Sequence, residues 1–342
     1  MMLSRLFLPH VGGVERHIDS ISKELAERGF DIILITEKHD FGLKPIEKIG
    51  PVKILRFNSP KVKYLGLLII WFQLFRLYYE EIKKADIVHI HDVFIWYLPF
   101  RLLFPRKPVY ITFHGYESYP IGKVAILQRK IAEKLTRGNI CIGDFMKRWY
   151  GTKPTIVSYG AVDLSKFRPD NKSKYKYDAI FSSRLDEQTG IDVYLKAVKE
   201  IQKTYPGFKF LVLGDGKYRK EAQENAISLG FVEDPSSYFK QSKFAFVSRY
   251  LAILEAFAAK KLVFAVYDNP VKRDYLKMAP YKDWIVIEKD YKKLAKKAEF
   301  YLNNPKKAKV MVEKAYGWVQ DQTWGKMADN YEELWGTRTQ IV

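Results

Sequence analysis

Short apolar runs alternate with stretches of helical periodicity along most of the chain. The clearest example covers residues 244–266, where two apolar runs, Phe244–Val247 and Leu262–Val266, flank a segment with helical spacing. Four apolar side chains form one face of this helix: Ile253, Leu254, Phe257 and Ala258. The order strand, helix, strand predicts a unit of a parallel α/β sheet, in which ligands bind at the carboxyl edge.

Two polar residues of this segment are candidates for a binding site. Ser248 follows the first strand, where its hydroxyl is expected to cap the helix. Glu255 is expected near the start of the helix, where a carboxylate is well placed to accept hydrogen bonds from a ribose hydroxyl pair. The alternative is a surface glutamate that interacts favourably with the helix dipole. Spacing alone leaves both interpretations open.

The beginning of the chain repeats the pattern with a glycine turn. The apolar run Leu3–Leu8 predicts a strand, and apolar residues then recur at helical intervals from Val14 to Leu25. Between them, Gly12 and Gly13 let the backbone approach a ligand and leave the first N–H groups of the helix directed at it, which suits a phosphate. Tight turns also use paired glycines, so this signal is weak by itself.

The remaining elements follow from the same two periodicities. We expect further strands at 31–36, 52–57, 86–90, 109–113, 140–142, 155–158, 178–182, 208–213 and 284–287. We expect further helices at 191–201, 291–302, 306–319 and 324–335. The turns after two of these strands are candidate ligand loops, one beginning with Arg184 and the other formed by Gly214, Asp215 and Gly216. The second turn brings backbone near a ligand or simply reverses the chain.

Residues Val62–Tyr79 form the most apolar stretch of the chain. The stretch is too short for a membrane span, and Gln73 and Arg76 interrupt it. One interpretation is a buried helix. The other is a helix with exposed aromatic side chains that lies on a membrane or docks a lipid-linked acceptor, aided by four flanking lysines: Lys61, Lys63, Lys83 and Lys84.

Three histidines lie in or just beyond predicted strands of the first half. His89 alternates with apolar neighbours and is expected to be structural. His91 and His114 follow strand ends, where an imidazole can reach a substrate. No third ligand has a spacing that suits zinc, so we expect no metal. His114 is the better candidate for an acid, a base or a hydrogen-bond donor to a sugar.

Length and composition set the frame for these elements. The 342 residues exceed what one hydrophobic core usually supports, so we expect domains at 1–165 and 177–320 and a final helical segment at 321–342. The boundary is placed in Phe167–Lys176, which has the composition of a linker. The net charge of +19 favours contact with polyanions, an anionic membrane surface or phosphorylated substrates.

The single cysteine and the N-terminus indicate the compartment. Cys141 can form no internal disulfide and lies in an apolar run, which predicts a core residue in a reducing environment. The first residues lack the pattern of a signal peptide, so we expect a cytoplasmic protein. Abundant Lys, Tyr and Ile with one Cys is compatible with a thermophilic source.

Eight motifs in a fixed order resemble those of the GT-B glycosyltransferases, and within them the retaining family 4. They are PHVGGVERH (9–17), DIVHIHD (86–92), TFHG (112–115), YGAVD (159–163), SRLDEQTG (183–190), LVLGDG (211–216), LGFV (229–232) and SRYLAILEAFAAKKLVFA (248–265). The resemblance covers nearly the whole chain. It implies an α/β fold of two Rossmann-like, doubly wound domains facing a central cleft. The first domain would receive the acceptor, the second would hold a nucleotide-sugar, and the last helix would cross back to the first domain.

The resemblance also implies roles for individual residues. Gly12 and Gly13 would approach the donor phosphate, and His114 would hydrogen-bond the donor sugar near the reacting centre. Arg184 would bind the diphosphate with the paired donors of its guanidinium, and Glu255 would hold the ribose. Other donor-binding positions are Gly214, Asp215, Ser248 and Leu251. No metal and no cofactor are implied, because cationic side chains and helix N-termini can neutralise the leaving diphosphate.

The sequence departs from the family pattern at two positions. The family usually has a lysine just before the glycine of the arginine loop, and this chain has Thr189. Three nearby cations could substitute: Lys217, Arg219 and Arg249. The family also has a glutamate eight positions before the one at 255, in a glycine-containing loop, and this chain has Val247 there, as if about four residues had been removed.

These features together predict a retaining transferase. It would move a hexose from a UDP-sugar or GDP-sugar to a hydroxyl of a lipid-linked or saccharide acceptor, in the cytoplasm with peripheral contact at the inner membrane face. Nucleic acid is not expected as a partner. A sugar-nucleotide epimerase would need more acidic and histidine groups around the sugar. The alternative outside catalysis is a degenerate GT-B scaffold that binds polyanions or a partner transferase, which Thr189, Val247 and the charge motivate.

Overall fold

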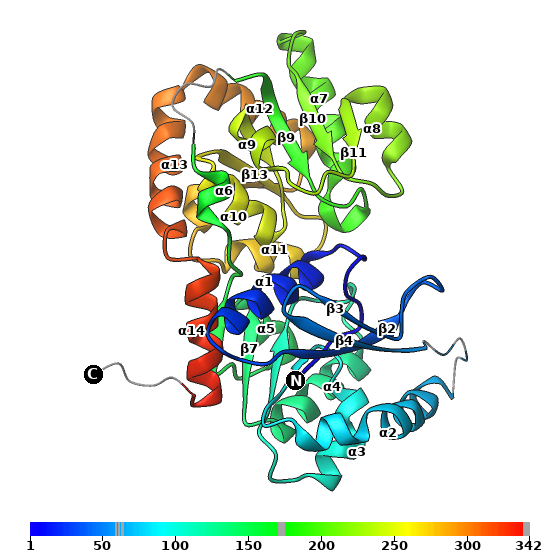
Figure 1. Cartoon of the computed structure of the whole chain (residues 1–342). Coiled ribbons are helices and arrows are strands. Elements are labelled where there is room, and N and C mark those ends of the chain that lie inside the picture. The colour runs from blue at the N-terminus through cyan, green and yellow to red at the C-terminus, as the bar shows by residue number, and fades with distance from the viewer. Residues whose placement is uncertain (59, 61, 63–64, 170–174, 338–342) are drawn as a thin grey trace. The chain divides into compact units, whose positions relative to one another are not determined.

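The chain folds into two units, each built around one sheet. The structure, a computed structural model, describes residues 1–58, 60, 62, 65–169 and 175–337 (Figure 1). Unit 1 contains residues 1–158 together with the segment that begins at Trp324, and unit 2 contains Tyr159–Thr323. The predicted linker at 167–176 lies partly outside the described residues, as do Lys61 and Lys63.

Within the described part of unit 1, eight strands form one sheet in the order β3-β4-β2-β1-β5-β6-β7-β8. All neighbouring strands are parallel except β3 and β4, which are antiparallel. The strands are β1 (Met2–Leu3), β2 (Ile33–Lys38), β3 (Ile46–Ile49), β4 (Val52–Asn58), β5 (Val88–His91), β6 (Val109–Phe113), β7 (Gly138–Ile142) and β8 (Ile156–Ser158). Strands β5, β6 and β7 are buried throughout, which is typical of a parallel sheet covered on both faces.

The helices of unit 1 come from both ends of the chain. They are α1 (Gly13–Glu27), α2 (Gly66–Lys84), α3 (Phe94–Leu103), α4 (Lys123–Leu135), α5 (Phe145–Tyr150) and α14 (Trp324–Trp335). Helix α14 packs against α1, and α3 packs against α2 and α4. None of the helices in the described ranges combines the length and the apolar composition that crossing a membrane requires.

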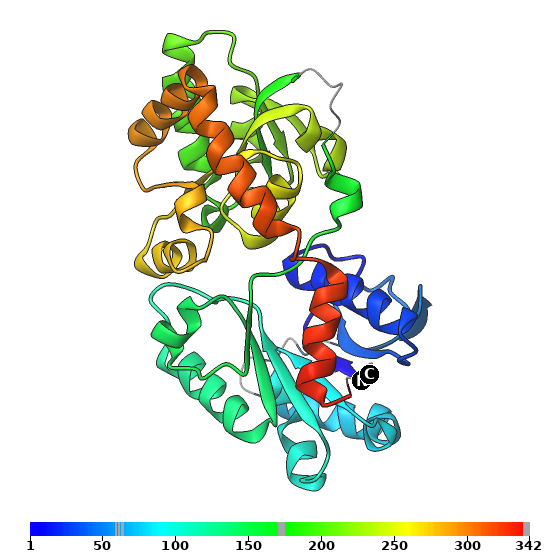
Figure 2. The ribbon, with the colours of Figure 1, turned by 90° about the vertical axis from the view of Figure 1, so that its left-hand side faces the viewer.

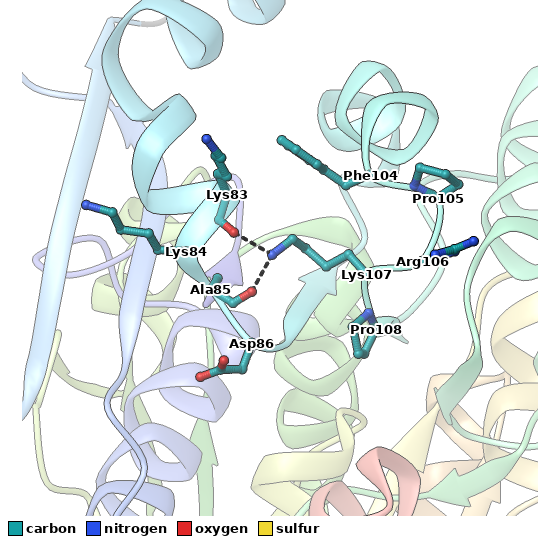
Figure 3. A pocket seen from close by; sticks show the side chains of 9 residues that line it. All are labelled: Lys83, Lys84, Ala85, Asp86, Phe104, Pro105, Arg106, Lys107 and Pro108. Atoms are coloured by element: carbon teal, nitrogen blue, oxygen red, sulfur yellow. Dashed lines mark hydrogen bonds between the residues drawn. The ribbon is translucent and has the colours of Figure 1, made fainter.

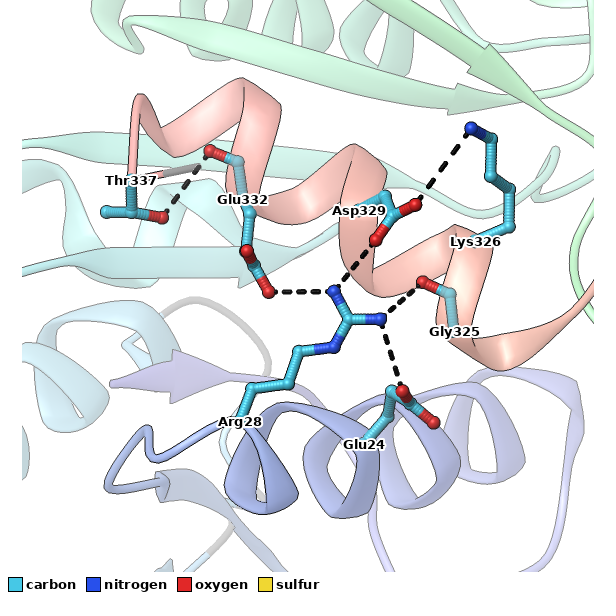
Figure 4. Close-up of polar contacts among 7 residues, drawn as sticks. All are labelled: Glu24, Arg28, Gly325, Lys326, Asp329, Glu332 and Thr337. Atoms are coloured by element: carbon cyan, nitrogen blue, oxygen red, sulfur yellow. Dashed lines mark hydrogen bonds and ion pairs between the residues drawn. The ribbon is translucent and has the colours of Figure 1, made fainter. Parts of the chain in front are cut away.

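One arginine fastens α1 to α14 (Figure 4). Arg28 directly follows α1, and its Nη1 lies 2.8 Å from both Asp329 and Glu332 of α14. Its Nη2 donates to Glu24 at 3.2 Å and to the main-chain oxygen of Gly325 at 2.8 Å. Because three carboxylates surround one guanidinium, this contact is stronger than an isolated surface ion pair.

Within the described part of unit 2, six parallel strands form a sheet in the order β11-β10-β9-β12-β13-β14. They are β9 (Tyr177–Ser182), β10 (Phe210–Leu213), β11 (Ile227–Gly230), β12 (Ser242–Phe246), β13 (Leu262–Val266) and β14 (Val286–Glu288). The aromatic side chains of Tyr194, Phe246 and Phe264 meet at the centre of the core, with ring centroids 5.2 to 5.5 Å apart along that series.

Helices of several lengths accompany the sheet of unit 2. Its α-helices are α6 (Leu164–Phe167), α7 (Ile191–Thr204), α8 (Arg219–Asn225), α9 (Ser236–Lys240), α10 (Tyr250–Ala258), α11 (Pro270–Lys277), α12 (Tyr291–Asn303) and α13 (Pro305–Val319). Two 3₁₀ turns, η1 (Glu187–Thr189) and η2 (Lys282–Trp284), complete it. Helix α7 packs against α12. Helix α13, the long orange helix of unit 2 in Figure 2, packs against α10.

The predicted α/β class with two parallel sheets is confirmed, and most elements lie where periodicity placed them. The predicted helix at 324–335 and the strand at 262–266 match α14 and β13 residue for residue. Two expectations differ. The first strand covers Met2–Leu3 only, since Ser4 Oγ donates to the oxygen of Leu6 and closes a local turn. Two edge strands, β3 in unit 1 and β11 in unit 2, were missed, because their alternating exposed residues carry little apolar signal.

Candidate functional site

The carboxyl edge of the unit 1 sheet carries a cluster of histidines. His91 ends β5, and His114 follows β6, so the parallel register brings both to the same edge. His91 Nδ1 lies 2.9 Å from His114 Nε2, and the two rings are stacked. His17 of α1 meets the ring of His114 edge to face at 4.8 Å. Sequence analysis singled out His91 and His114 but missed His17, whose helical spacing gave no signal.

A directed chain of hydrogen bonds fixes the protonation of two of these histidines. The indole N–H of Trp335 can only donate, and it lies 3.0 Å from His89 Nδ1, so the proton of His89 is on Nε2. That nitrogen lies 2.8 Å from Thr112 Oγ1, which in turn lies 3.1 Å from the Tyr331 hydroxyl. Tyr331 then donates to His17 Nε2 at 2.9 Å. The predicted structural role of His89 is confirmed, since the residue is fully buried.

The buried histidines are neutral. Burial, followed by the positive charge of neighbouring histidines, lowers the pKa values of His17, His89 and His91 well below the ordinary value. For His89, a second proton would also place a donor on Nδ1 against the donor of Trp335. Neutral imidazoles therefore hold this edge of the sheet together.

His114 is suited to hydrogen bonding. Burial lowers its pKa to about 3, so it is neutral at physiological pH. His91 Nε2 is buried and has no partner among the described residues. Since an orphaned buried N–H group is rare, we infer that the His91 proton is on Nδ1 and points at His114 Nε2. His114 then carries its own proton on Nδ1, where it can be donated to a ligand. Of the three predicted roles, these facts favour a hydrogen-bond donor over a general acid.

The loop after His114 is held by a buried arginine that sequence analysis missed. Arg129 donates to the main-chain oxygen of Gly115 and, at 2.9 Å, to Glu117. Its guanidinium lies 3.8 Å above the ring of Tyr150, whose hydroxyl donates to the same Glu117. Asp92 accepts the backbone N–H of His114 at 3.1 Å and so fixes the start of the loop.

The glycine turn before α1 has the predicted form. Gly12 is the N-cap residue and Gly13 begins the helix. A Cβ on Gly13 would meet nothing within 4 Å, whereas one on Gly12 would collide with the carboxylate of Glu15. Glu15 is buried and lies 3.2 Å from His10 Nδ1. The helix N-terminus thus has open space at Gly13 and an acidic neighbour at Gly12.

In unit 2, the hydroxyl of Ser248 fastens the sheet and does not cap α10. Ser248 Oγ accepts the N–H of Val266 at 2.8 Å and lies 2.6 Å from the hydroxyl of Tyr194. The N-cap of α10 is Arg249, which makes no side-chain capping bond, so the predicted cap is wrong. The Ser248 hydroxyl points to the neighbouring strand because the buried N–H of Val266 there needs a hydrogen-bond acceptor.

Glu255 lies deeper in the molecule than predicted. It is the sixth residue of α10, past the middle of the helix, and only 6% of it is exposed. Both the position near the helix start and the alternative of a surface glutamate are therefore wrong. A buried carboxylate needs hydrogen-bonding or charged partners, which makes Glu255 a stronger candidate for a ligand or network contact than spacing suggested. Leu251, at the second position of α10, is half-buried.

The turn at Gly214, Asp215 and Gly216 packs on the arginine loop. The two glycines have φ values of +143° and +146°. A Cβ on Gly214 would overlap the main chain of Ser183, and one on Gly216 that of Leu185. The Leu185 N–H donates to the main-chain oxygen of Asp215 at 2.9 Å. This contact between two loops explains why glycine is required there.

The arginine loop itself is ordered by its own side chains. Arg184 Nη2 lies 3.2 Å from Asp186, and the arginine side chain remains more than half exposed. Thr189, which stands where a lysine was expected, is buried, and its hydroxyl lies 2.8 Å from the Arg184 oxygen and 2.7 Å from the Asp186 oxygen. Gly190 closes the loop with a φ of +78°.

A basic pocket lies at the opposite, amino-terminal edge of the unit 1 sheet (Figure 3). It has a volume of about 690 Å³, and its cations are Lys83, Lys84, Arg106 and Lys107. The ammonium of Lys107 reaches across to the main-chain oxygens of Lys83, at 2.9 Å, and of Ala85. Among residues with described positions, no three His, Cys, Asp or Glu side chains are grouped to hold a metal ion.

Two family models match in succession and together cover most of the chain. The model for Glycosyltransferase Family 4 matches residues 11–166, and the model for Glycosyl transferases group 1 matches residues 163–318. The chain belongs to the group 1 glycosyltransferases of GT-B fold. The histidine edge of unit 1 lies in the first match, and Arg184 and Glu255 lie in the second.

Relatives of this group 1 glycosyltransferase match over part of their length. One subunit of the human phosphatidylinositol N-acetylglucosaminyltransferase is 28% identical over 244 residues, which are 64% of this chain and 48% of the relative. An uncharacterised glycosyltransferase of Methanocaldococcus jannaschii is 23% identical over 233 residues, 65% of this chain and 62% of the relative. The matches thus span about half to three-fifths of these relatives.

Solved structures confirm the GT-B fold. Sucrose-phosphate synthase from Thermosynechococcus elongatus superposes with a TM-score of 0.75 at 15% identity, covering 98% of this chain and 99% of that one. Anabaena HepE in complex with UDP and glucose superposes with a TM-score of 0.73 at 13% identity, with the same coverage. At these identities the likeness shows the architecture alone.

Proposed function

We propose that this glycosyltransferase moves a hexose from a nucleoside diphosphate sugar to a hydroxyl of a lipid-linked or saccharide acceptor, with retention at the anomeric carbon. The observation that carries the proposal is the carboxyl edge of unit 2. There, the exposed guanidinium of Arg184 follows β9, and the buried carboxylate of Glu255 belongs to the helix after β12, its immediate neighbour in the sheet. Ligands of open α/β sheets bind at this edge.

Each candidate residue has a chemical role in this proposal. Glu255 accepts hydrogen bonds from the ribose, and Arg184 offers paired donors to the diphosphate. Gly214, Asp215 and Leu251 line the donor site, and Ser248 positions it through its bond to β13. In unit 1, the N–H groups at Gly12 and Gly13 approach a phosphate, and His114 donates Nδ1–H to the sugar.

The proposed reaction uses the groups named above. The acceptor oxygen forms a bond to the anomeric carbon as the bond to the diphosphate oxygen breaks. The acceptor proton passes to the leaving diphosphate, which spares the protein a general base. This fits a neutral His114, whose pKa of about 3 makes it a poor proton acceptor.

The names of similar proteins support the substrate classes. The human relative belongs to an N-acetylglucosaminyltransferase for phosphatidylinositol, which favours a lipid acceptor. A structural neighbour is in complex with UDP and glucose, which favours a UDP-sugar donor.

The test is a thermal-shift screen of the whole protein with UDP, GDP, ADP, their sugar conjugates and inorganic diphosphate. A ligand at a hundred times its Kd should add about 2.7 kcal/mol to the stability of the folded state. We expect one nucleoside diphosphate to exceed inorganic diphosphate. The variant Glu255→Gln should lose that excess and keep the shift by inorganic diphosphate, whereas the exposed control Glu224→Gln should keep both. Equal shifts by all anions, removed by salt, would refute the transferase and favour the polyanion-binding scaffold.

We also propose peripheral contact with an anionic membrane through α2, α3 and the basic pocket. Leu68 and Phe72 of α2 and Leu102 of α3 are 55%, 64% and 72% exposed, and the pocket with its four cations lies at the C-terminal ends of these two helices. Apolar insertion and headgroup attraction act together at such surfaces. Vesicles containing phosphatidylglycerol should bind the protein more strongly than pure phosphatidylcholine vesicles. Phe72→Ser should weaken binding severalfold, and the equally exposed Val310→Ser in unit 2 should not.

A further inference from the structure

Unit 2 contains a buried lysine that forms no ion pair with an acidic side chain of the described residues. Lys272, in the first turn of α11, is 1% exposed, and its Nζ donates to the main-chain oxygen of Gln188 at 2.8 Å. The ammonium has three donors, and the described residues supply this one acceptor. Fully buried lysines are rare unless they are paired. Burial, followed by the positive charge of Arg249, lowers the pKa of Lys272 well below its ordinary value.

A second cation converges on the same glutamine. Arg249, at the N-cap of α10, donates from Nη2 to Gln188 Oε1 at 2.9 Å. No carboxylate in the described part of the chain forms an ion pair with Arg249 or Lys272. The two oxygens of Gln188 therefore serve two positive groups as neutral acceptors. Asp268 and Asp186 act on Lys272 without direct contact, and the charge of Arg249 opposes them, so an anion that bonded to both cations would offset the cost of burying them.

The arginine loop presents Gln188 rigidly between them. Thr189 anchors the loop through its buried hydroxyl, and the φ of +78° at Gly190 turns the chain where a Cβ would collide with Val266. The loop follows β9, Arg249 follows β12 and α11 follows β13, so three adjacent strands bring these groups to one edge of the sheet. Arg184, on the same loop, is the proposed diphosphate ligand.

The other cations considered from the sequence are already occupied. Lys217 is exposed and paired with Glu187, and Arg219 is exposed and lies 3.0 Å from Asp215. To bind a phosphate, each of them would have to leave its carboxylate, whereas Lys272 and Arg249 form no ion pair that would have to be broken.

We propose that Lys272 and Arg249 bind the diphosphate of the donor, which takes the place of the Gln188 side chain on Arg249 and reaches the unused donors of Lys272. This inference rests on the proposed nucleotide-sugar activity. Lys272 then supplies from α11 the positive charge that Thr189 cannot supply from the arginine loop. In the reaction, it stabilises the charge that develops on the leaving diphosphate.

The chain offers a matched control for this lysine. Lys261 is also buried, at 4% exposure, and its Nζ also donates to one main-chain oxygen, that of Lys240 at 3.0 Å. Burial lowers its pKa to about 8. It precedes β13, at the edge of the sheet opposite to α11. Lys261→Met and Lys272→Met therefore remove comparable buried amines from opposite edges of the sheet.

The experiment is isothermal calorimetry of the intact protein with inorganic diphosphate and with the nucleoside diphosphate that binds best. Lys272→Met should weaken both ligands at least tenfold without lowering the melting temperature of the free protein, because it removes a buried charge. Lys272→Arg should retain part of the affinity, and Lys261→Met should leave it unchanged. At about pH 8, wild type should take up more protons on binding than Lys272→Met does, as measured in buffers of different ionisation enthalpy. Arg249→Gln, which alters a half-buried side chain, provides the same affinity test if Lys272→Met fails to fold.

The outcomes separate this inference from the proposed function. If wild type binds a nucleoside diphosphate and both methionine variants bind it equally well, the role of Lys272 is refuted and the transferase stands. If wild type binds no nucleoside diphosphate better than inorganic diphosphate, the proposed function is refuted and this inference with it.

Discussion

Acidification from about pH 7.5 to pH 5 is expected to unfold unit 1 selectively, because neutral histidines are built into its sheet edge. His17, His89 and His91 are at most 5% exposed, and burial lowers the pKa of each. In the unfolded chain, the same side chains titrate near the ordinary histidine pKa of about 6.5. The unfolded state therefore binds more protons below that pH, and stability falls as the pH falls.

The magnitude follows from the number of buried rings. One histidine that stays neutral in the folded state costs about 2 kcal/mol by pH 5, since each pH unit below 6.5 contributes about 1.4 kcal/mol. These three residues and His114, whose pKa of about 3 also lies below this range, together cost about 8 kcal/mol, which is comparable to the whole stability of many domains. The slope approaches about 5 kcal/mol per pH unit. All six histidines of the chain lie in unit 1, so unit 2 is an internal control.

The assay is urea-dependent hydrogen exchange of the intact protein, read peptide by peptide at several pH values and corrected for intrinsic exchange. Peptides of unit 1 should lose protection steeply below about pH 6.5, and those of unit 2 should not. His89→Gln should reduce the slope by about a quarter, because it removes one of four titrating rings. A unit 1 stability that is flat between pH 7.5 and 5, or an unchanged slope in the variant, would refute the assignment of neutral buried imidazoles.

Three further predictions test individual contacts. Ser248→Ala should lower the unfolding free energy of unit 2 by about 2 kcal/mol in urea titrations, because the buried Val266 N–H loses its acceptor and the Tyr194 hydroxyl keeps only the main-chain oxygen of Phe264. Cys141 should not react with Ellman's reagent at about pH 8 until urea unfolds unit 1, since burial raises its pKa to about 11. Arg28→Leu should speed hydrogen exchange in α14 at least tenfold and cost about 1 to 3 kcal/mol, and unchanged exchange would show that packing alone holds the helix.

The order of strands and helices was readable because its signals are local. A continuous apolar run predicts the buried strand Leu262–Val266, and apolar side chains at helical intervals predict the helix Trp324–Trp335. Both patterns are contained in a short stretch of sequence. The motifs of unit 2 were readable for a related reason, since a strand, a glycine turn and a helix are consecutive. This local information was sufficient for the fold class and for placing Arg184 after a strand.

Side-chain partners were decided by strand order, which brings distant segments together. His17 and Tyr331 are 314 positions apart, and Trp335 lies 246 positions beyond His89, yet both pairs are hydrogen-bonded. Local spacing predicted that Ser248 caps a helix, but its hydroxyl accepts a hydrogen bond from the N–H of Val266 in the neighbouring strand.

Strand order also explains why the sequence did not single out Lys272. Thr189 carries no charge, and the sequence suggested Lys217, Arg219 and Arg249 as substitutes. Lys272 reaches Gln188 across 84 positions, because β9, β12 and β13 are adjacent in the sheet although not all consecutive in the chain. The sequence by itself determined which segments form strands and helices, since that choice depends on neighbours along the chain. Only the tertiary structure decided which polar groups meet, because a buried donor or acceptor takes the partner that folding brings within reach.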